Sequence, residues 1–202
     1  MIGARLLENT MRIAIEQPIR SMLCVAFLAV ANPLSALGAD SLEQREALRV
    51  HGRSSPLVEK VRAATERYLD INVAIAEGWV RATPCVSGPN SGAMGVHLIL
   101  PARVGDGVLR ADQPEALIYE PLPNGRMRLV GVEFIVIAET WDTQNPAAQP
   151  QLDGHLLNLV SAPNRYRLPA FYELHVWAWA RNPNGNFADW NSQVSCDWQP
   201  AE

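Results

Sequence analysis

The stretch Leu129-Val-Gly-Val-Glu-Phe-Ile-Val-Ile137 decides the expected fold. It is apolar at almost every position, so both faces of a strand formed by it would be covered, which is typical of a central strand. Before it, Asn124-Gly125 is a strong signal for a hairpin turn, and Glu115 to Glu120 is a second short apolar segment. The sequence therefore predicts a hairpin whose second strand, residues 128–138, lies in the middle of a sheet.

Two further strands are expected, one on each side of this hairpin in the sequence. Residues 93–100 form the first and end at Pro101, and residues 171–180 form the last. Residues 142–170 are polar and rich in proline, so we expect little regular structure there. The expected sheet thus has about four strands.

An amphipathic helix is predicted before the strands. Ser54-Ser55-Pro56 supplies a capping serine and a proline for the first turn. Apolar residues then recur at steps of three and four as far as Ile75, and Gly78 ends the helix. The expected fold for residues 56–202 is a single α+β domain, with one long amphipathic helix packed on a curled, mainly antiparallel sheet. A small β-sandwich with a helical arm is the alternative.

The N-terminal residues 1–39 have the parts of a secretory signal peptide. A basic leader ends near Arg20, the apolar run Met22–Ala31 follows, and small residues precede Asp40. The apolar run is too short to cross ~30 Å of hydrocarbon as a helix. We therefore expect cleavage, export to the periplasm or the outside of the cell, and no stable membrane insertion. An uncleaved anchor is the alternative, and residues 40–55 are expected to be a polar arm or short helix.

Removal of the leader changes the cysteine count. The chain has three cysteines, and Cys24 lies in the predicted signal peptide. The remaining pair, Cys85 and Cys196, would meet an oxidising compartment, which favours a disulfide bond. Two free thiols or a shared metal are the alternatives. The disulfide would enclose all four predicted strands in one loop.

The charge balance excludes one class of partner. The chain has 17 Lys and Arg against 21 Asp and Glu, which gives a formal net charge of −4. Contacts to phosphate dominate nucleic-acid binding, and the sequence has no cluster of basic residues to make them. We therefore expect no nucleic-acid partner. The oligomeric state is left open.

Three metal-ligating side chains lie within three different predicted strands: His97, Glu133 and His175. Glu133 shares its face with apolar residues, and a buried carboxylate needs a partner, a proton or a cation. Two imidazoles and a carboxylate can bind Zn²⁺, Fe²⁺ or Cu²⁺ with a position left open. Glu120 and His155 are the candidate fourth ligands.

The same residues also have an interpretation without a metal. His97 and His175 could be hydrogen-bonded core histidines, with Glu133 paired to Arg128 or Arg126. A small-ligand pocket that contains no metal is a third interpretation. No short ligand signature in the sequence decides between them.

Two tryptophans of the last strand are candidate ligand-stacking residues. Trp177 and Trp179 alternate with His175, so strand periodicity predicts that all three share a face. Their rings could stack on a sugar, with Glu120 and Glu133 as paired acids. Tryptophans at such positions fill cores at least as often.

Several segments carry a resemblance to a known family. They are Gly92-Ala-Met-Gly-Val-His97, Pro114-Glu-Ala-Leu-Ile-Tyr-Glu-Pro121, Leu129-Val-Gly-Val-Glu133, Leu174-His-Val-Trp-Ala-Trp179, and Asn182 to Asn191 followed by Val194-Ser-Cys196. Over residues 60–198 the chain resembles an uncharacterised family of exported bacterial proteins. The resemblance implies export and one shared fold, and it supplies no reaction.

Three functions follow as hypotheses. The first is an exported module that binds a metal ion or small ligand through His97, Glu133 and His175. The second is a metal-dependent hydrolase or oxygenase at the same residues, so whether the protein is an enzyme stays open. The third is a structural or interaction protein that uses its tryptophan-rich strand and tail.

Overall fold

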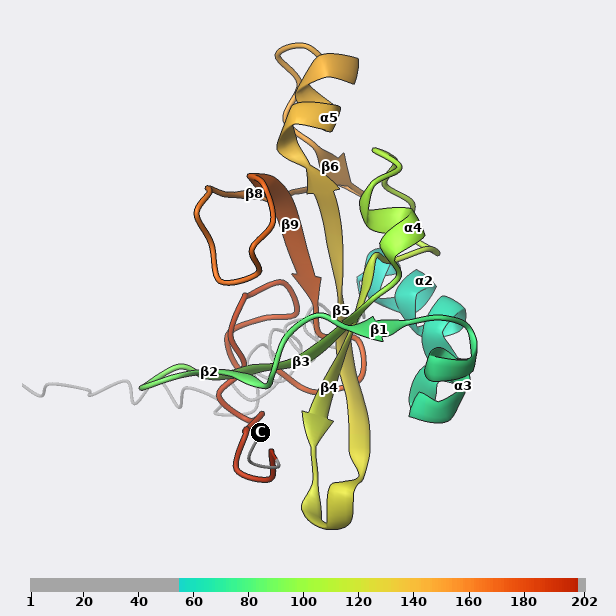
Figure 1. Ribbon diagram of the computed structural model, residues 1–202, viewed down its shortest axis with the longest axis vertical. Helices are drawn as coiled ribbons and strands as arrows, with labels where there is room; N and C mark the ends of the chain where they lie inside the picture. The colour runs from blue at the N-terminus through green and yellow to red at the C-terminus, as the bar shows by residue number, and fades with distance from the viewer. Residues whose placement is uncertain (1–54, 200–202) are drawn as a thin grey trace, which may run out of the picture. The chain divides into compact units, whose positions relative to one another are not determined.

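The structure is a computed structural model that describes residues 55–199. The predicted signal peptide, and the predicted arm except for Ser55, lie outside the described residues. The described part is α+β, with a largely antiparallel sheet and a few short helices (Figure 1). Within it, no helix combines the length and the apolar character needed to cross a membrane.

The main sheet has seven strands instead of the expected four or so. Six of them follow the order β1 (Val80–Arg81), β3 (Gly92–Ile99), β4 (Ala116–Pro121), β5 (Met127–Ile137), β9 (Phe171–Val176) and β8 (Asn158–Val160), while β2 (Val86–Gly88) also pairs with β3. The four predicted strands correspond to β3, β4, β5 and β9. The three additional strands have only two or three residues each, which is too short for a readable period.

The central position predicted for β5 is confirmed. It pairs with β4 on one side and β9 on the other, and its residues 129–136 are all buried. The Asn124-Gly125 turn joins β4 to β5 as expected, within the short 3₁₀ turn η2 (Pro123–Gly125). Asn124 and Gly125 have φ values of 62° and 70°, the left-handed conformations that favour these two residue types.

The 142–170 segment has more regular structure than expected. It begins within α5 (Ala138–Gln144), continues into a separate two-stranded sheet of β6 (Gln151–Leu152) and β7 (His155–Leu156), and then supplies β8. A further short helix, α4 (Pro101–Val104), follows β3. These short elements depend on pairing with other parts of the chain, which the sequence pattern does not report.

The predicted long helix is broken into three pieces. These are α2 (Pro56–Thr65), the 3₁₀ turn η1 (Glu66–Leu69) and α3 (Ile71–Ala76). At the first break, the Thr65 hydroxyl donates a hydrogen bond of 2.7 Å to the carbonyl of Val61. At the second, the Asp70 carboxylate accepts one of 2.9 Å from the backbone N–H of Asn72 and caps α3. The start at Ser55 and Pro56 is as predicted.

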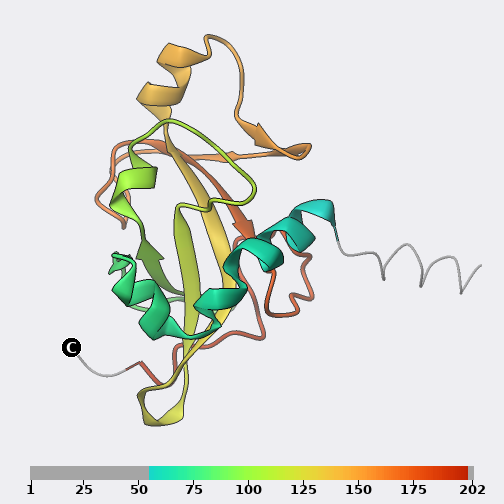
Figure 2. The same cartoon turned by 90° about the vertical axis from the view of Figure 1, so that its right-hand side faces the viewer.

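The two faces of the sheet are covered by different parts of the chain. The helices α2 and α3 run across one face (Figures 1 and 2), over a core that includes Val58 and Val61 of α2 and Leu117, Phe134 and Leu174 of the sheet. The opposite face carries two smaller apolar clusters. They contain Ala93, Ile118, Val130, Trp177 and Val194 in one, and Val104, Ala116, Ile135 and Phe171 in the other.

The C-terminal tail is fastened over that second face at several points. The predicted disulfide is confirmed: Cys85 is bonded to Cys196, with 5.6 Å between their Cα atoms. Ala93 and Asn191 exchange two backbone hydrogen bonds of 3.1 Å each. This contact requires Gly92, because a Cβ atom there would lie 2.1 Å from the carbonyl oxygen of Asn191.

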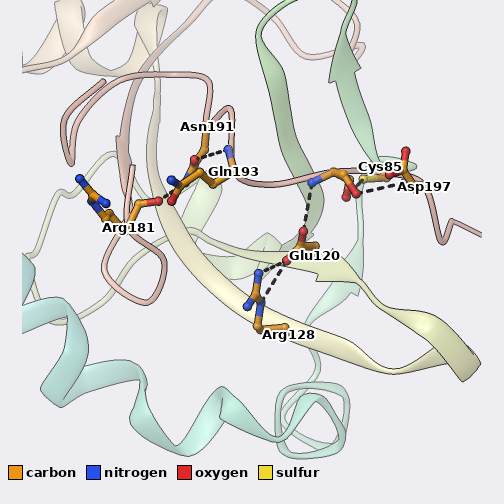
Figure 3. Close-up of polar contacts among 8 residues, drawn as sticks. Cys85, Glu120, Arg128, Arg181, Asn191, Gln193 and Asp197 are labelled. Atoms are coloured by element: carbon orange, nitrogen blue, oxygen red, sulfur yellow. Dashed lines mark hydrogen bonds and ion pairs between the residues drawn. The ribbon is translucent and has the colours of Figure 1, made fainter. Parts of the chain in front are cut away.

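A carboxylate makes another attachment of the tail. Glu120 accepts a 3.0 Å hydrogen bond from the backbone N–H of Ser195 and forms an ion pair with Arg128 of β5 (Figure 3). Asn191 in turn donates to the carbonyl of Arg181 and accepts from the N–H of Gln193. The tail is thus held to the sheet by covalent, ionic and backbone contacts.

Replacing both Cys85 and Cys196 by serine is expected to loosen the tail before the helices. The bond closes a loop across a sequence separation of 111 residues, so its loss should cost roughly 4–5 kcal/mol of unfolding free energy in the chain-entropy model. Native-state hydrogen exchange should accelerate first at Ala93 and Asn191. Earlier exchange in α2 would contradict this order.

Candidate metal centre

The three predicted ligands come together on the tail-covered face of the sheet. His97 lies on β3, Glu133 on β5 and His175 on β9, and their ligand atoms all lie within 4.8 Å of one another. The side chains are buried, with exposed fractions of 1 %, 1 % and 0 %. Three strands therefore contribute to one cluster.

Strand register accounts for this convergence. Glu133 is directly opposite His175, so these two side chains are cross-strand neighbours. His97 lies one strand further away, beyond β4, where the small side chain of Ala116 is opposite Glu133. His97 itself is directly opposite Ile118 of β4, and its Nε2 atom lies 3.4 Å from the Oε2 atom of Glu133.

Several polar atoms of the cluster have no hydrogen-bond partner among the described residues. They are His97 Nε2, Glu133 Oε1, Glu173 Oε2, and both ring nitrogens of His175. Buried polar groups are almost always paired, and an unpaired one costs ~1–3 kcal/mol. All of these atoms belong to side-chain types that bind metal ions. A cation could pair with the lone-pair nitrogens of the imidazoles and with the carboxylate oxygens among these atoms.

Thr83 fixes the orientation of His97. The Thr83 hydroxyl lies 3.2 Å from Nδ1 of His97, and it accepts a 3.3 Å hydrogen bond from the backbone N–H of the same histidine. With Nδ1 engaged, Nε2 is the nitrogen that points toward Glu133. Ligating histidines generally have their second nitrogen held in this way. Thr83 is two residues from Cys85, and nothing in the sequence identified it.

Two more carboxyl groups adjoin His175. Glu173 is close enough to raise the pKa of Glu133, and Asp189 Oδ1 lies 3.9 Å from His175 Nδ1. Glu173, His175 and Asp189 form a second group whose ligand atoms lie within 4.8 Å. Strand periodicity could have found Glu173, which is two residues before His175. Asp189 comes from a turn-rich tail segment that carries no such signal.

The two candidate fourth ligands are not part of the cluster. Glu120 is held by Arg128 and Ser195, beyond a register shift between Ile118 and Tyr119 of β4. His155 stacks on the ring of Phe187, with 3.8 Å between ring centroids. Arg128, one of the two arginines considered as partners of Glu133, thus pairs with Glu120 instead.

The tryptophans do not share one face. Strand β9 ends at Val176, so the alternation that predicted a common face for Trp177 and Trp179 stops there. Trp177 is 1 % exposed beside His175, and its indole N–H donates to the carbonyl of Ala188. Trp179 lies on the helix side and donates to the Thr65 hydroxyl at 2.9 Å. Both rings fill space within the fold.

Burial sets the protonation of the cluster. It lowers the pKa of His97 to about 4 and that of His175 to about 3, so both imidazoles are neutral at pH 7. Burial, together with the neighbouring Glu173, raises the pKa of Glu133 well above the usual value for a glutamate. Neutral imidazoles have the lone pairs that metal binding requires, and a bound cation would favour ionised Glu133.

The His97, Glu133 and His175 side chains can hold a single metal ion if they move slightly. Ligand atoms ~2.0–2.2 Å from a tetrahedral Zn²⁺ are ~3.3–3.6 Å from one another. The ligand atoms of the cluster lie within 4.8 Å of one another, so side-chain movements of about an ångström would bring them to these distances. Two imidazoles with one to three carboxylates suit Zn²⁺, Cu²⁺ or Fe²⁺.

A buried carboxyl near the cluster gives a test of these electrostatics. Glu115 is 1 % exposed and accepts a 3.0 Å hydrogen bond from the N–H of Ile135, and burial raises its pKa to about 8. Its protonated form is therefore favoured by folding. The contribution of protonated Glu115 to the free energy of unfolding is complete below about pH 4.5 and declines as the pH rises to about 8.

We expect Glu115→Gln to reduce the loss of stability between about pH 4.5 and about pH 8. The removed slope is at most about 1.4 kcal/mol per pH unit. Urea unfolding at several pH values measures it, with the exposed Glu139→Gln as the matched control. An identical slope in the two variants would show that Glu115 ionises freely in the folded protein.

Comparison with known proteins gives no information on function, which is therefore inferred from the site itself. No protein-family model, curated protein or solved structure matches this chain.

Proposed function

We propose that this protein is an exported domain that binds one divalent transition-metal ion through His97, Glu133 and His175. The observation that carries the proposal is the set of unpartnered nitrogen and oxygen atoms, all buried and directed into one cluster. Burying polar atoms without hydrogen-bond partners opposes folding. A bound cation would pair with His97 Nε2, a Glu133 oxygen and one ring nitrogen of His175, and would offset part of that cost.

The surrounding residues give the ion its further ligands. Glu173 and Asp189 flank His175, so carboxylate oxygens are available beyond the first three donors. Neutral histidines favour Zn²⁺, Cu²⁺ and Fe²⁺ over Mg²⁺ and Ca²⁺, which prefer oxygen ligands alone. The ion is therefore expected to be a first-row transition metal.

Export is part of the same proposal. The Cys85–Cys196 bond is of the kind found in oxidising compartments. The basic leader and apolar run of residues 1–39 and the resemblance to exported bacterial proteins point the same way. We assign the domain to the periplasm or the cell exterior.

A metal-dependent hydrolase or oxygenase at the same residues is the second candidate. One observation favours it: the Asp189 side chain is 39 % exposed, although the histidine it adjoins is buried. The ion would thus have one ligand at the surface, where a substrate could replace it. Addition of azide to the Co²⁺-loaded protein tests this candidate, because an exchangeable position would alter the visible spectrum and a closed ligand shell would not.

Zn²⁺ or Cu²⁺ is expected to stabilise the protein against heat. At 100 times the dissociation constant the gain is about 2.7 kcal/mol, which corresponds to about 5–10 °C for a domain of this size. Glu133→Gln, which is close in shape, and His175→Ala should abolish the shift. His155→Ala, a histidine outside the cluster, should retain it.

Metal analysis of the purified protein accompanies this measurement. One equivalent of metal in the wild-type protein and its loss in Glu133→Gln are the expected results. No thermal shift with any first-row divalent ion would overturn the proposal. Equal shifts in the His155 and His175 variants would also overturn it, because the metal would then bind elsewhere.

A further inference from the structure

A cavity of about 240 Å³ lies on the helix side of the sheet, away from the metal centre. Its walls are α3, strands β1 and β3, the turn between β4 and β5, and the end of the tail. Val96 and Leu98 belong to the sheet face that packs against the helices, whereas His97 between them points to the other face. The cavity and the metal centre are therefore separate sites.

The lining is apolar and partly exposed at the rim. Ile75 and Trp198 line the cavity, and 57 % and 56 % of their surfaces are exposed. Large exposed apolar side chains around one concavity are typical of a binding site. Drug-sized molecules occupy ~300–1,000 Å³, so a ligand of this cavity is smaller.

One buried donor in the cavity wall has no partner. Trp79 is 3 % exposed, and its indole N–H makes no hydrogen bond with the described residues. An indole N–H can only donate, so its natural partner in a ligand is a hydrogen-bond acceptor. A buried tryptophan normally has such a partner.

Positively charged side chains lie in the cavity wall and beside the Trp79 ring. Arg126, on the turn between β4 and β5, is an exposed lining residue, and the guanidinium of Arg103 lies 5.5 Å from the Trp79 ring centroid. Among the described residues that line the cavity, none is an aspartate or a glutamate. An acceptor that carries a negative charge is therefore favoured over a neutral one.

We propose that this cavity binds a small amphiphilic monocarboxylate, with its apolar chain or ring between α3 and the tail and its carboxylate toward Trp79 and the arginines. The apolar walls select the body of the ligand, and the unpartnered N–H and the positive charge select its head. This site is independent of the metal centre, so either proposal can fail without the other.

Octanoate, octanol and octylamine are suitable probes, because they share a chain and differ in the charge of the head group. Titration into the purified protein is followed by the indole N–H resonance of Trp79 and by tryptophan fluorescence. Octanoate at up to about 1 mM is expected to shift the resonance to saturation. Octanol should bind at least about tenfold more weakly and octylamine more weakly still.

Two charge-reversal variants, both at exposed positions and both expected to fold, test this assignment. Arg126→Glu should weaken octanoate binding about tenfold or more. Arg110→Glu, an exposed arginine that does not line the cavity, should change it less than about twofold. Trp79→Phe, which removes the donor, should weaken octanoate more than octanol.

Two results would overturn this assignment. One is the absence of any octanoate-dependent shift of the Trp79 resonance in that concentration range. The other is the lack of head-group selection, seen either as equal affinity for the three probes or as equal effects of the two charge reversals.

Discussion

The structure depends on how one carboxyl group is buried in the middle of the sheet. Glu133 lies on the central strand β5, directly opposite His175 of β9 and 3.4 Å from His97. Burial of a carboxyl without a full set of partners disfavours folding, and the cross-strand neighbour of Glu133 on the other side, Ala116 of β4, is apolar. Burial raises the pKa of Glu133, so the carboxyl can stay protonated, which limits this cost without a cation.

The two faces of the sheet differ in polarity. The helix side is continuous and apolar, with Leu57, Phe134 and Val176 fully buried in one core. The other side is split into two small apolar clusters with the polar cluster on the same face. The hydrophobic stabilisation of the larger core is what allows the fold to tolerate unpaired polar atoms on the opposite face.

The tail makes the second face into a site. The bond from Cys85 to Cys196 and the pairing of Asn191 with Ala93 hold the tail over the sheet, and the segment carrying Asp189 leads into these attachments. The same disulfide is two residues from Thr83, which orients His97. One covalent bond therefore lies close in the chain to the residue that orients His97 and to the tail segment that carries Asp189.

The sequence by itself determined the central strand, the hairpin at Asn124-Gly125, the helix start at Ser55 and the pairing of the two cysteines. The first three follow from local patterns. The cysteine pairing follows because only two cysteines remain once the predicted signal peptide is removed. Strand alternation also selected His97, Glu133 and His175, because it reports which face a side chain occupies. Only the tertiary structure decided that the three meet, that Asp189 joins them and that Glu120 does not. Those outcomes depend on register across β4 and on the path of the tail, which no local period in the sequence encodes.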